Sequence, residues 1–252
     1  MSIAEKLTTI AENIPKVYAA GQQNGSEPIW DAIQGGGSRV DYENAFVTIN
    51  FSPETFKPLH SFKPTKAAAM FRNCPSNATF AMENGQVDMK ALEESQGITF
   101  DFSEVTNFTQ TFTGALFSAL NVIDISKATT LAYAFYGGYV SNGAVRLKRI
   151  ERLICSETSA FVSNTFNLQS RLEYIGFEGV IAKSLTLTSC PLVPESMKKA
   201  ILCLKSFAGT SSEYSCSIKF SDECWATLEA DSTAPNGGTW KDYVYNVLCW
   251  NY

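Results

Sequence analysis

The chain has 252 residues, of which 45% are hydrophobic, 12% aromatic and 18% charged, and this composition excludes a disordered or fibrous protein. A globular chain of this length buries roughly 70 to 75% of its unfolded surface, so it needs neither disulfides nor a metal to hold a core. The net charge of −5 argues against a nucleic-acid partner, because it offers no basic surface for phosphates.

Residues 1–20 are predicted to form an amphipathic helix, because their apolar residues recur at alternating spacings of four and three: Ile3, Leu7, Ile10, Ile14 and Val17. This face either caps the chain's own core or mediates self-association. The segment lacks the uninterrupted apolar core of a signal peptide, and no stretch is long enough to span a membrane. Synthesis in the cytoplasm without membrane insertion is therefore expected. Residues 21–38 are predicted to be a loop with a short helix at 30–33.

The middle of the chain contains an internal repeat. Residues 101–114 align without a gap on residues 124–137, and shorter copies ending on phenylalanine occur at 67–71 and 162–166. A second phrase, Leu-x-x-Ile, recurs at Leu120/Ile123, Leu147/Ile150 and Leu172/Ile175. Periods of this size are typical of solenoids, in which each unit buries its apolar side by stacking on its neighbours.

Short alternating runs at 98–102, 122–125, 174–177 and 184–187 predict strands that stack in parallel as one sheet, from about residue 98 to 188. The phenylalanine phrases predict single turns on the opposite wall, which would bury Phe71, Phe112, Phe135 and Phe166. Residues 86–95 are predicted to form a longer helix inserted between the first two units.

After Pro191 the repeat stops. Pro194 is predicted to begin a helix of about a dozen residues that Gly209 terminates. A strand is expected at 214–220, a turn at 236–238, and a helix from Thr239 to Val247. The aromatic residues of this end are expected to seal the solenoid rather than bind a ligand: Trp240, Tyr243, Tyr245, Trp250 and Tyr252.

The predicted fold class is therefore α/β, a leucine-rich-repeat-like solenoid with a short parallel sheet. Residues 1–60 are expected to form a helical attachment segment, residues 61–195 the solenoid, and residues 196–252 an α+β cap. The repeat length and the phenylalanine phrases resemble leucine-rich-repeat proteins of the BspA-like kind over residues 61–195. The segments 4–18, 30–32, 41–46 and 190–192 also resemble uncharacterised proteins of gut-bacterial genomes and prophages, often encoded near tail genes. The resemblance implies a binding or structural module, with an association with virions or phage tails, and no catalytic residue.

Few residues carry recognisable chemistry. His60 is the only histidine and lies outside the repeat, so a surface role is favoured over a catalytic one. The seven cysteines contain no CxxC pair and are interpreted as small hydrophobes, and no metal or cofactor is expected. The basic cluster Arg146, Lys148, Arg149 and Arg152 is interpreted as a solvated face, with contact to an anionic group as the alternative.

Candidate site residues lie on the predicted sheet. The repeat alignment places Asp101, Asp124 and Glu151 at matching positions of successive strands, which predicts a column of carboxylates on the exposed face. Thr186, on the fourth predicted strand, completes the candidate binding residues. Nearby basic residues could simply neutralise such a column, or the column could bind a polar ligand or a cation.

Two functions follow from these predictions. The favoured one is a non-enzymatic module that recognises a protein or a glycan surface through the repeat sheet. The alternative is a glycan-cleaving solenoid, because carboxylates on adjacent or alternate strands approach the separations of retaining or inverting glycosidases.

Overall fold

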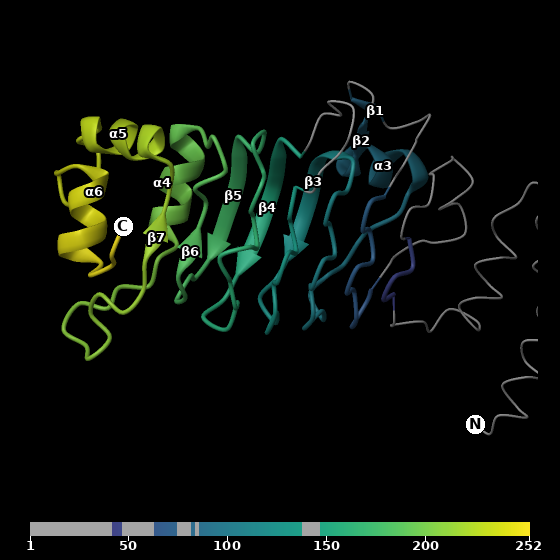
Figure 1. The fold of residues 1–252 in the computed structure, drawn as a ribbon, viewed down its shortest axis with the longest axis horizontal. Coiled ribbons are helices and arrows are strands. Elements are labelled where there is room, and N and C mark those ends of the chain that lie inside the picture. The colour runs from purple at the N-terminus through teal and green to yellow at the C-terminus, as the bar shows by residue number, and fades with distance from the viewer. Residues whose placement is uncertain (1–41, 47–62, 75–81, 84–85, 138–146) are drawn as a thin grey trace, which may run out of the picture.

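The computed structural model describes residues 42–46, 63–74, 82–83, 86–137 and 147–252 (Figure 1). The predicted N-terminal helix, the short helix at 30–33 and His60 lie outside the described residues.

The chain folds as a mixed α/β structure around an open five-stranded sheet of order β1-β2-β3-β4-β5. Strands β2 to β5 run parallel to one another, and β1 pairs antiparallel with β2. The strands span Met82–Glu83 (β1), Gln86–Asp88 (β2), Phe117–Asp124 (β3), Arg149–Cys155 (β4) and Tyr174–Gly179 (β5). A parallel sheet in this part of the chain is therefore confirmed, although it begins at β2 and ends at β5.

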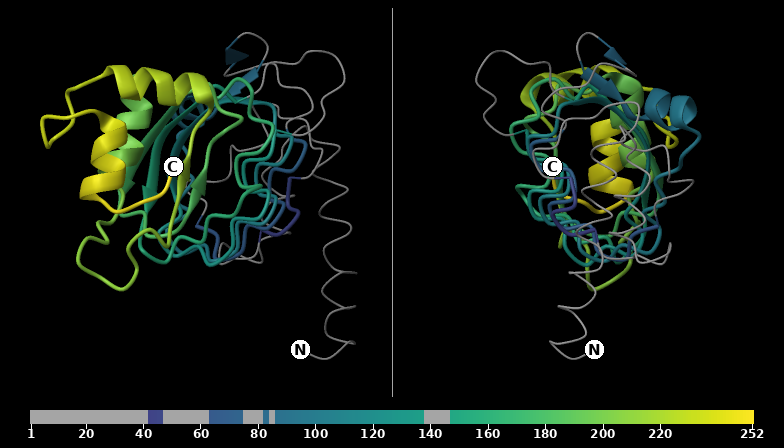
Figure 2. Two further views of the ribbon diagram at one scale, coloured as in Figure 1. Left: turned by 60° about the vertical axis from the view of Figure 1, so that its left-hand side comes forward. Right: turned by 90° about the vertical axis from the view of Figure 1, so that its right-hand side faces the viewer.

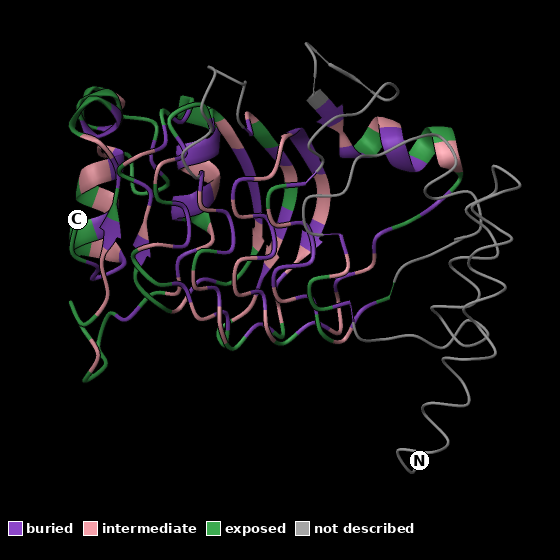
Figure 3. Cartoon of the chain, turned by 45° about the vertical axis from the view of Figure 1, so that its right-hand side comes forward, coloured by how far each residue is buried: buried purple, intermediate pink, exposed green. Residues whose placement is uncertain are grey.

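Apolar residues at matched register positions line the inner face of the sheet. Leu120 pairs with Ile150 and Ile150 with Ile175, and all three side chains are fully buried. Gly176, next to Ile175, is required by the close approach of β4, because a Cβ there would lie 2.0 Å from the Glu151 carbonyl oxygen. Residues of β4 that lie between the inward positions are exposed or partly exposed (Figure 3).

The wall opposite the sheet is made of stacked turns (Figure 2). Their phenylalanine rings stack nearly parallel, with centroid separations of 5.2, 5.6, 5.6 and 5.0 Å along the series Phe46, Phe71, Phe112, Phe135 and Phe166. All five are buried, as the repeated phrases predicted for four of them. The turn at 42–46 is a fifth copy, which the alignment of internal repeats in the sequence did not include.

The same backbone geometry recurs from turn to turn. The backbone N–H of each of the first four phenylalanines donates to the carbonyl of the residue that precedes the next phenylalanine, over 2.8 to 2.9 Å. These bonds run from Phe46 to Met70, Phe71 to Thr111, Phe112 to Ala134 and Phe135 to Thr165. Four of the phenylalanines also follow, by two residues, a residue with left-handed φ: Asn44, Ala69, Gln110 and Tyr133. Such a φ is uncommon outside glycine, so its recurrence marks these turns as copies of one unit.

Helix α3 (Met89–Gln96) follows β2 directly and begins at Asp88, whose side chain accepts from the Ala91 N–H. The prediction of a helix at 86–95 was therefore right in its centre and wrong in its first turn, which belongs to β2. The prediction of a strand at 98–102 was wrong. Phe100 takes part in an isolated β-bridge only, and its N–H donates to the Glu93 carboxylate at 2.9 Å.

Helix α4 (Pro194–Leu202) lies at the other edge of the sheet, next to β5. It begins at Pro194 as predicted but ends before Cys203, so Gly209 is not its terminator. The prediction that residues 184–187 join the main sheet was also wrong. Strand β6 (Leu185–Thr186) pairs in parallel with β7 (Ile218–Lys219) in a separate two-stranded sheet, and β7 is the only named strand in the predicted strand at 214–220.

Three further helical segments complete the C-terminal part: α5 (Asp222–Ala230), α6 (Trp240–Asp242) and the π-helical η1 (Tyr243–Val247). Thr239 caps α6 by accepting from the Asp242 N–H, as the sequence predicted. Trp250 is fully buried, stacks on Phe207 at 5.6 Å and donates its indole N–H to the Lys205 carbonyl. Tyr245 and Tyr252 are instead 42% and 49% exposed, so only some of the aromatic residues fill the end of the core.

Candidate functional site

The strand register does not produce the predicted column of carboxylates. Asp124 pairs with Ile154, whereas Glu151 lies three residues earlier on β4, level with the middle of β3. Three residues of extended chain separate positions by about 10 Å along a strand. The placement of Glu151 beside Asp124 was therefore wrong, and the two carboxylates are not on adjacent rungs at one level of the sheet.

Asp101 and Asp124 do occupy equivalent places in their units. Each carboxylate accepts a hydrogen bond from the backbone N–H two residues on, Asp101 from Ser103 at 3.0 Å and Asp124 from Ser126 at 2.8 Å. Asp101 also pairs with Lys63 at 3.2 Å. Partial burial raises the pKa of Asp101, but the hydrogen bonds from Ser103 and the contact with Lys63 outweigh it and lower the pKa overall. Both carboxylates thus stabilise turns, and the turn at Asp124 directly follows β3.

Thr186 lies on β6, outside the sheet that carries Asp124 and Glu151. Of the four candidate binding residues, only Asp124 and Glu151 belong to strands of the main sheet, because Asp101 follows α3 in a segment without a named strand.

The structure instead brings basic and acidic side chains together on the exposed face of β4 and β5. Arg149 holds Glu151 through two contacts, one of them 2.9 Å from Nη2 to Oε2. Arg152 binds Glu178 through two parallel hydrogen bonds of 2.8 Å each. The hydrogen bonds from Arg152 lower the pKa of Glu178, which keeps that carboxylate ionised. Two residues of the basic cluster, Arg149 and Arg152, are therefore neutralised within the face, whereas Arg146 lies outside the described residues.

Tyr174 lies at the start of β5 between two cations. The Arg149 guanidinium is 5.0 Å from the centre of the ring, and the Lys199 ammonium of α4 is 5.1 Å from it. Lys199 also donates to the Tyr174 hydroxyl at 2.6 Å, and this contact raises the lysine's pKa. A shallow hollow of about 480 Å³ opens here, lined by Lys148, Arg149, Glu173, Tyr174, Val193 and Glu195. We call the residues Arg149, Glu151, Arg152, Tyr174 and Glu178 the sheet face.

Other chemistry is limited in the described part of the chain. No three His, Cys, Asp or Glu side chains gather there closely enough to hold a metal ion. The seven cysteines are free thiols, and five of them are buried. Burial raises the pKa of the Cys155 and Cys190 thiols, and raises that of Cys203 to about 11, so these groups are poor nucleophiles. None of the helices described has the length and apolar character needed to cross a bilayer.

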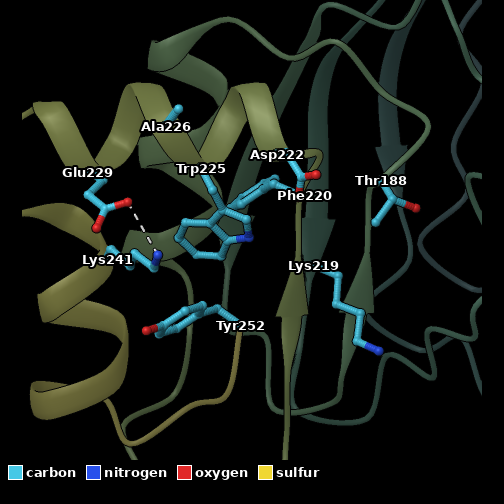
Figure 4. A pocket seen from close by; sticks show the side chains of 9 residues that line it. All are labelled: Thr188, Lys219, Phe220, Asp222, Trp225, Ala226, Glu229, Lys241 and Tyr252. Carbon is cyan, nitrogen blue, oxygen red and sulfur yellow. Dashed lines mark hydrogen bonds and ion pairs between the residues drawn. The ribbon is translucent and has the colours of Figure 1, made fainter.

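A second hollow, which the sequence did not predict, lies beside α5 (Figure 4). It has a volume of about 450 Å³, and Trp225, Phe220 and Tyr252 form its aromatic side. Ser221 caps α5 by accepting from the Cys224 N–H. The Ser-Asp-Glu sequence at 221–223 is a typical helix start, and it was the signal that could have revealed this helix and the Trp225 it positions.

Comparison with known proteins found no matching family model, no similar curated protein and no similar solved structure. A function therefore has to be inferred from the residues and geometry of the chain itself.

Proposed function

We propose that this chain is a non-enzymatic binding module, a leucine-rich-repeat-like solenoid that recognises a protein or a glycan through its sheet face. The observation that carries the proposal is the grouping of Arg149, Arg152 and Tyr174 with their acidic partners on an open sheet between α3 and α4. Arginine and tyrosine are enriched at the centres of recognition surfaces, because they combine a large contact area with hydrogen bonding.

The solenoid interpretation is supported by the five stacked phenylalanines and by the recurring left-handed residue in the turns. Kinship with BspA-like leucine-rich-repeat proteins, and attachment to a phage particle through the N-terminal segment, belong to the same proposal. Those two points rest on the sequence resemblance alone.

The geometry of the described strands argues against the glycan-cleaving alternative. It required neighbouring carboxylates at one level of the sheet, and the register places Glu151 and Asp124 roughly 10 Å apart along the strands. Each of these carboxylates also has a structural partner: Arg149 holds Glu151, and the Ser126 N–H donates to Asp124.

The test compares retention of bacterial polysaccharides and phage structural proteins by the immobilised chain and by sheet-face variants. Arg152→Glu and Tyr174→Ala should lose a component that the wild type retains, because they remove a cation and an aromatic surface. Lys127→Glu, a charge reversal at the exposed ion pair with Glu104 beyond β3, should keep it. The double variant Arg152→Glu/Glu178→Arg restores the ion pair and controls for stability.

Each polysaccharide is also assayed for release of reducing ends. The proposal expects no release by the wild type. Release that persists after purification, or retention that neither sheet-face variant changes, would contradict the assignment of this face as a non-catalytic recognition surface.

A further inference from the structure

The hollow beside α5 is built from the C-terminal part of the chain and is separate from the sheet face. Its volume of about 450 Å³ falls within the range of small-molecule sites. In Figure 4 the rings of Trp225, Phe220 and Tyr252 gather on one side, and Lys219 and Thr188 stand on the other. An apolar surface facing a few polar groups is the usual composition of a ligand site.

The aromatic side is rigidly held. Phe220 meets Trp225 edge to face at 5.1 Å, and Tyr252 lies 5.2 Å from Trp225 at an interplanar angle of 54°. The Lys241 ammonium lies 4.8 Å from the centre of the Tyr252 ring and is held by Glu229 at 3.3 Å. Tyr252 is nevertheless 49% exposed, so much of its ring remains open to a ligand.

Apart from the Lys241–Glu229 ion pair, the polar side-chain groups around these rings have no partner within the described residues. The indole N–H of Trp225 has no acceptor among the described residues and is not one of their fully buried polar atoms, so water or a ligand can reach it. Trp240 and Trp250 instead donate to Thr233 and to the Lys205 carbonyl. In Figure 4 the indole nitrogen of Trp225 is turned toward the side of Asp222 and Lys219. The Thr188 hydroxyl, the Lys219 ammonium and the Asp222 carboxylate likewise have no side-chain partner among the described residues, which leaves donors and acceptors free for a ligand.

The charges around the hollow balance. Lys219 is offset by Asp222, and Lys241 is paired with Glu229. A phosphate or another strong anion would require an excess of basic groups, as at Arg-rich sites. A neutral ligand with one apolar face and several hydroxyl groups fits better, because it can cover an aromatic ring and also accept and donate hydrogen bonds.

We propose that this hollow binds one pyranose ring of a neutral saccharide. The C–H face of the sugar would lie against the half-exposed ring of Tyr252, and its hydroxyl groups would bond to Asp222, Lys219 and the Trp225 N–H. This is a second site, and it does not depend on ligand binding at the sheet face.

The test titrates the full chain with maltose, cellobiose, lactose and N,N′-diacetylchitobiose by calorimetry and saturation-transfer NMR. At least one of these sugars should bind saturably. Tyr252→Ala should then weaken that binding by about tenfold, since it removes the one exposed ring of the hollow. Trp225→Phe, which keeps a ring but removes the N–H, should weaken it severalfold.

Tyr133→Ala is the matched control, because Tyr133 is 41% exposed but lies on the turn wall, and it should bind as the wild type does. Arg152→Glu on the sheet face should also leave sugar binding unchanged, which separates this proposal from the preceding one. The proposal is overturned if none of the four sugars saturates the chain, if Tyr252→Ala binds with unchanged affinity, or if only inorganic sulfate binds in the same titration.

Discussion

The side chain of Glu93 is buried between α3 and the sheet, with 9% of its residue surface exposed. One carboxylate oxygen accepts from the Phe100 N–H at 2.9 Å, and the other accepts from the Asn121 amide of β3. Burial raises the pKa of Glu93 above its ordinary value of 4.5, although these two hydrogen bonds act in the opposite direction. Glu93 therefore joins helix and sheet at the cost of holding a charge away from water.

This raised pKa predicts a specific pH dependence of stability. The folded state binds the Glu93 proton more readily than the unfolded state, so this contribution to stability is present below pH 4.5 and is lost as pH rises through the raised value. Glu93→Gln removes that loss, because a glutamine side chain has no charge to bury. Its amide oxygen can still accept from the Phe100 N–H, and the Asn121 amide can turn so that its oxygen accepts from the glutamine NH₂. The free energy of unfolding of the variant relative to the wild type should increase between about pH 4 and pH 8.

Urea unfolding across this pH range measures the difference. Glu94→Gln, an exposed carboxylate on the same helix that pairs with Lys90, is the control. Glu93→Ala should instead be destabilised by about 1 to 3 kcal/mol, because it leaves the Phe100 N–H and the Asn121 amide without acceptors. Parallel pH profiles for the wild type and Glu93→Gln would show that burial does not control this carboxyl group.

Among the elements, the turns could be predicted from the sequence and the strand register could not. The phenylalanine phrase occurs once per turn, so its position in each unit is unambiguous. The strand phrase is not unique, because Leu147, Ile150 and Leu153 form two overlapping copies of apolar-x-x-apolar. The prediction used the first copy, whereas β3 pairs Leu120 with Ile150 and Ile123 with Leu153. This shift of three residues separated Glu151 from Asp124.

Counting back from the phenylalanines comes within one residue of the observed register. Asp101, Asp124 and Cys155 each lie eleven residues before a stacked phenylalanine, and Asp124 pairs with Ile154, the residue next to Cys155. The position on β4 that pairs with Asp124 therefore carries the apolar Ile154 and no carboxylate. The hollow beside α5 was beyond this kind of prediction, because Thr188, Trp225 and Tyr252 come from segments that share no repeat and meet only through tertiary packing.

At the β5 edge of the sheet, a side chain of α4 pairs with the backbone of Ile175. The Ser196 hydroxyl is fully buried, accepts from the Ile175 N–H at 2.8 Å and donates to the Ile175 carbonyl at 3.0 Å. It thereby satisfies the backbone groups that a further strand would otherwise pair, which is a common way to protect a sheet edge.

Ser196→Ala should lower the free energy of unfolding by about 1 to 3 kcal/mol, because the buried Ile175 N–H and carbonyl lose their partner. Ser163→Ala, at an exposed serine, is the matched control and should change it by less than about 0.5 kcal/mol. The measurement is the shift of the urea unfolding midpoint between each variant and the wild type, with an unchanged dependence of the unfolding free energy on urea concentration. An equally small change in both variants would mean that water replaces Ser196 at this edge.

On the scale of the whole molecule, one hydrophobic cluster extends from Tyr42 to Trp250. It crosses residue 195, where the sequence predicted the boundary between a solenoid and a C-terminal cap. Cys190 links the two parts, because its Sγ lies 3.9 Å from the Phe166 carbonyl and its own carbonyl lies 3.9 Å from Cys224 Sγ on α5. A continuous core of this kind favours one cooperative unfolding unit over two independent ones.

Phe135→Ala tests this cooperativity. Its ring is fully buried between Phe112 at 5.6 Å and Phe166 at 5.0 Å, so truncation should cost roughly 3 to 5 kcal/mol through the cavity it leaves. For a chain of this size that loss corresponds to a melting temperature lower by roughly 6 to 20 °C.

The tryptophans provide a reporter on the far side of residue 195. In a Trp30→Phe background the emission comes from Trp225, Trp240 and Trp250 alone, all of them in the C-terminal part. If the core is one unit, Phe135→Ala should lower the midpoint measured by tryptophan fluorescence and the midpoint measured by far-UV circular dichroism by the same amount. Val162→Ala, at a 42% exposed position on the same wall, should move neither. A fluorescence midpoint that stays in place while the dichroism midpoint falls would mean that residues 196–252 unfold as a separate domain.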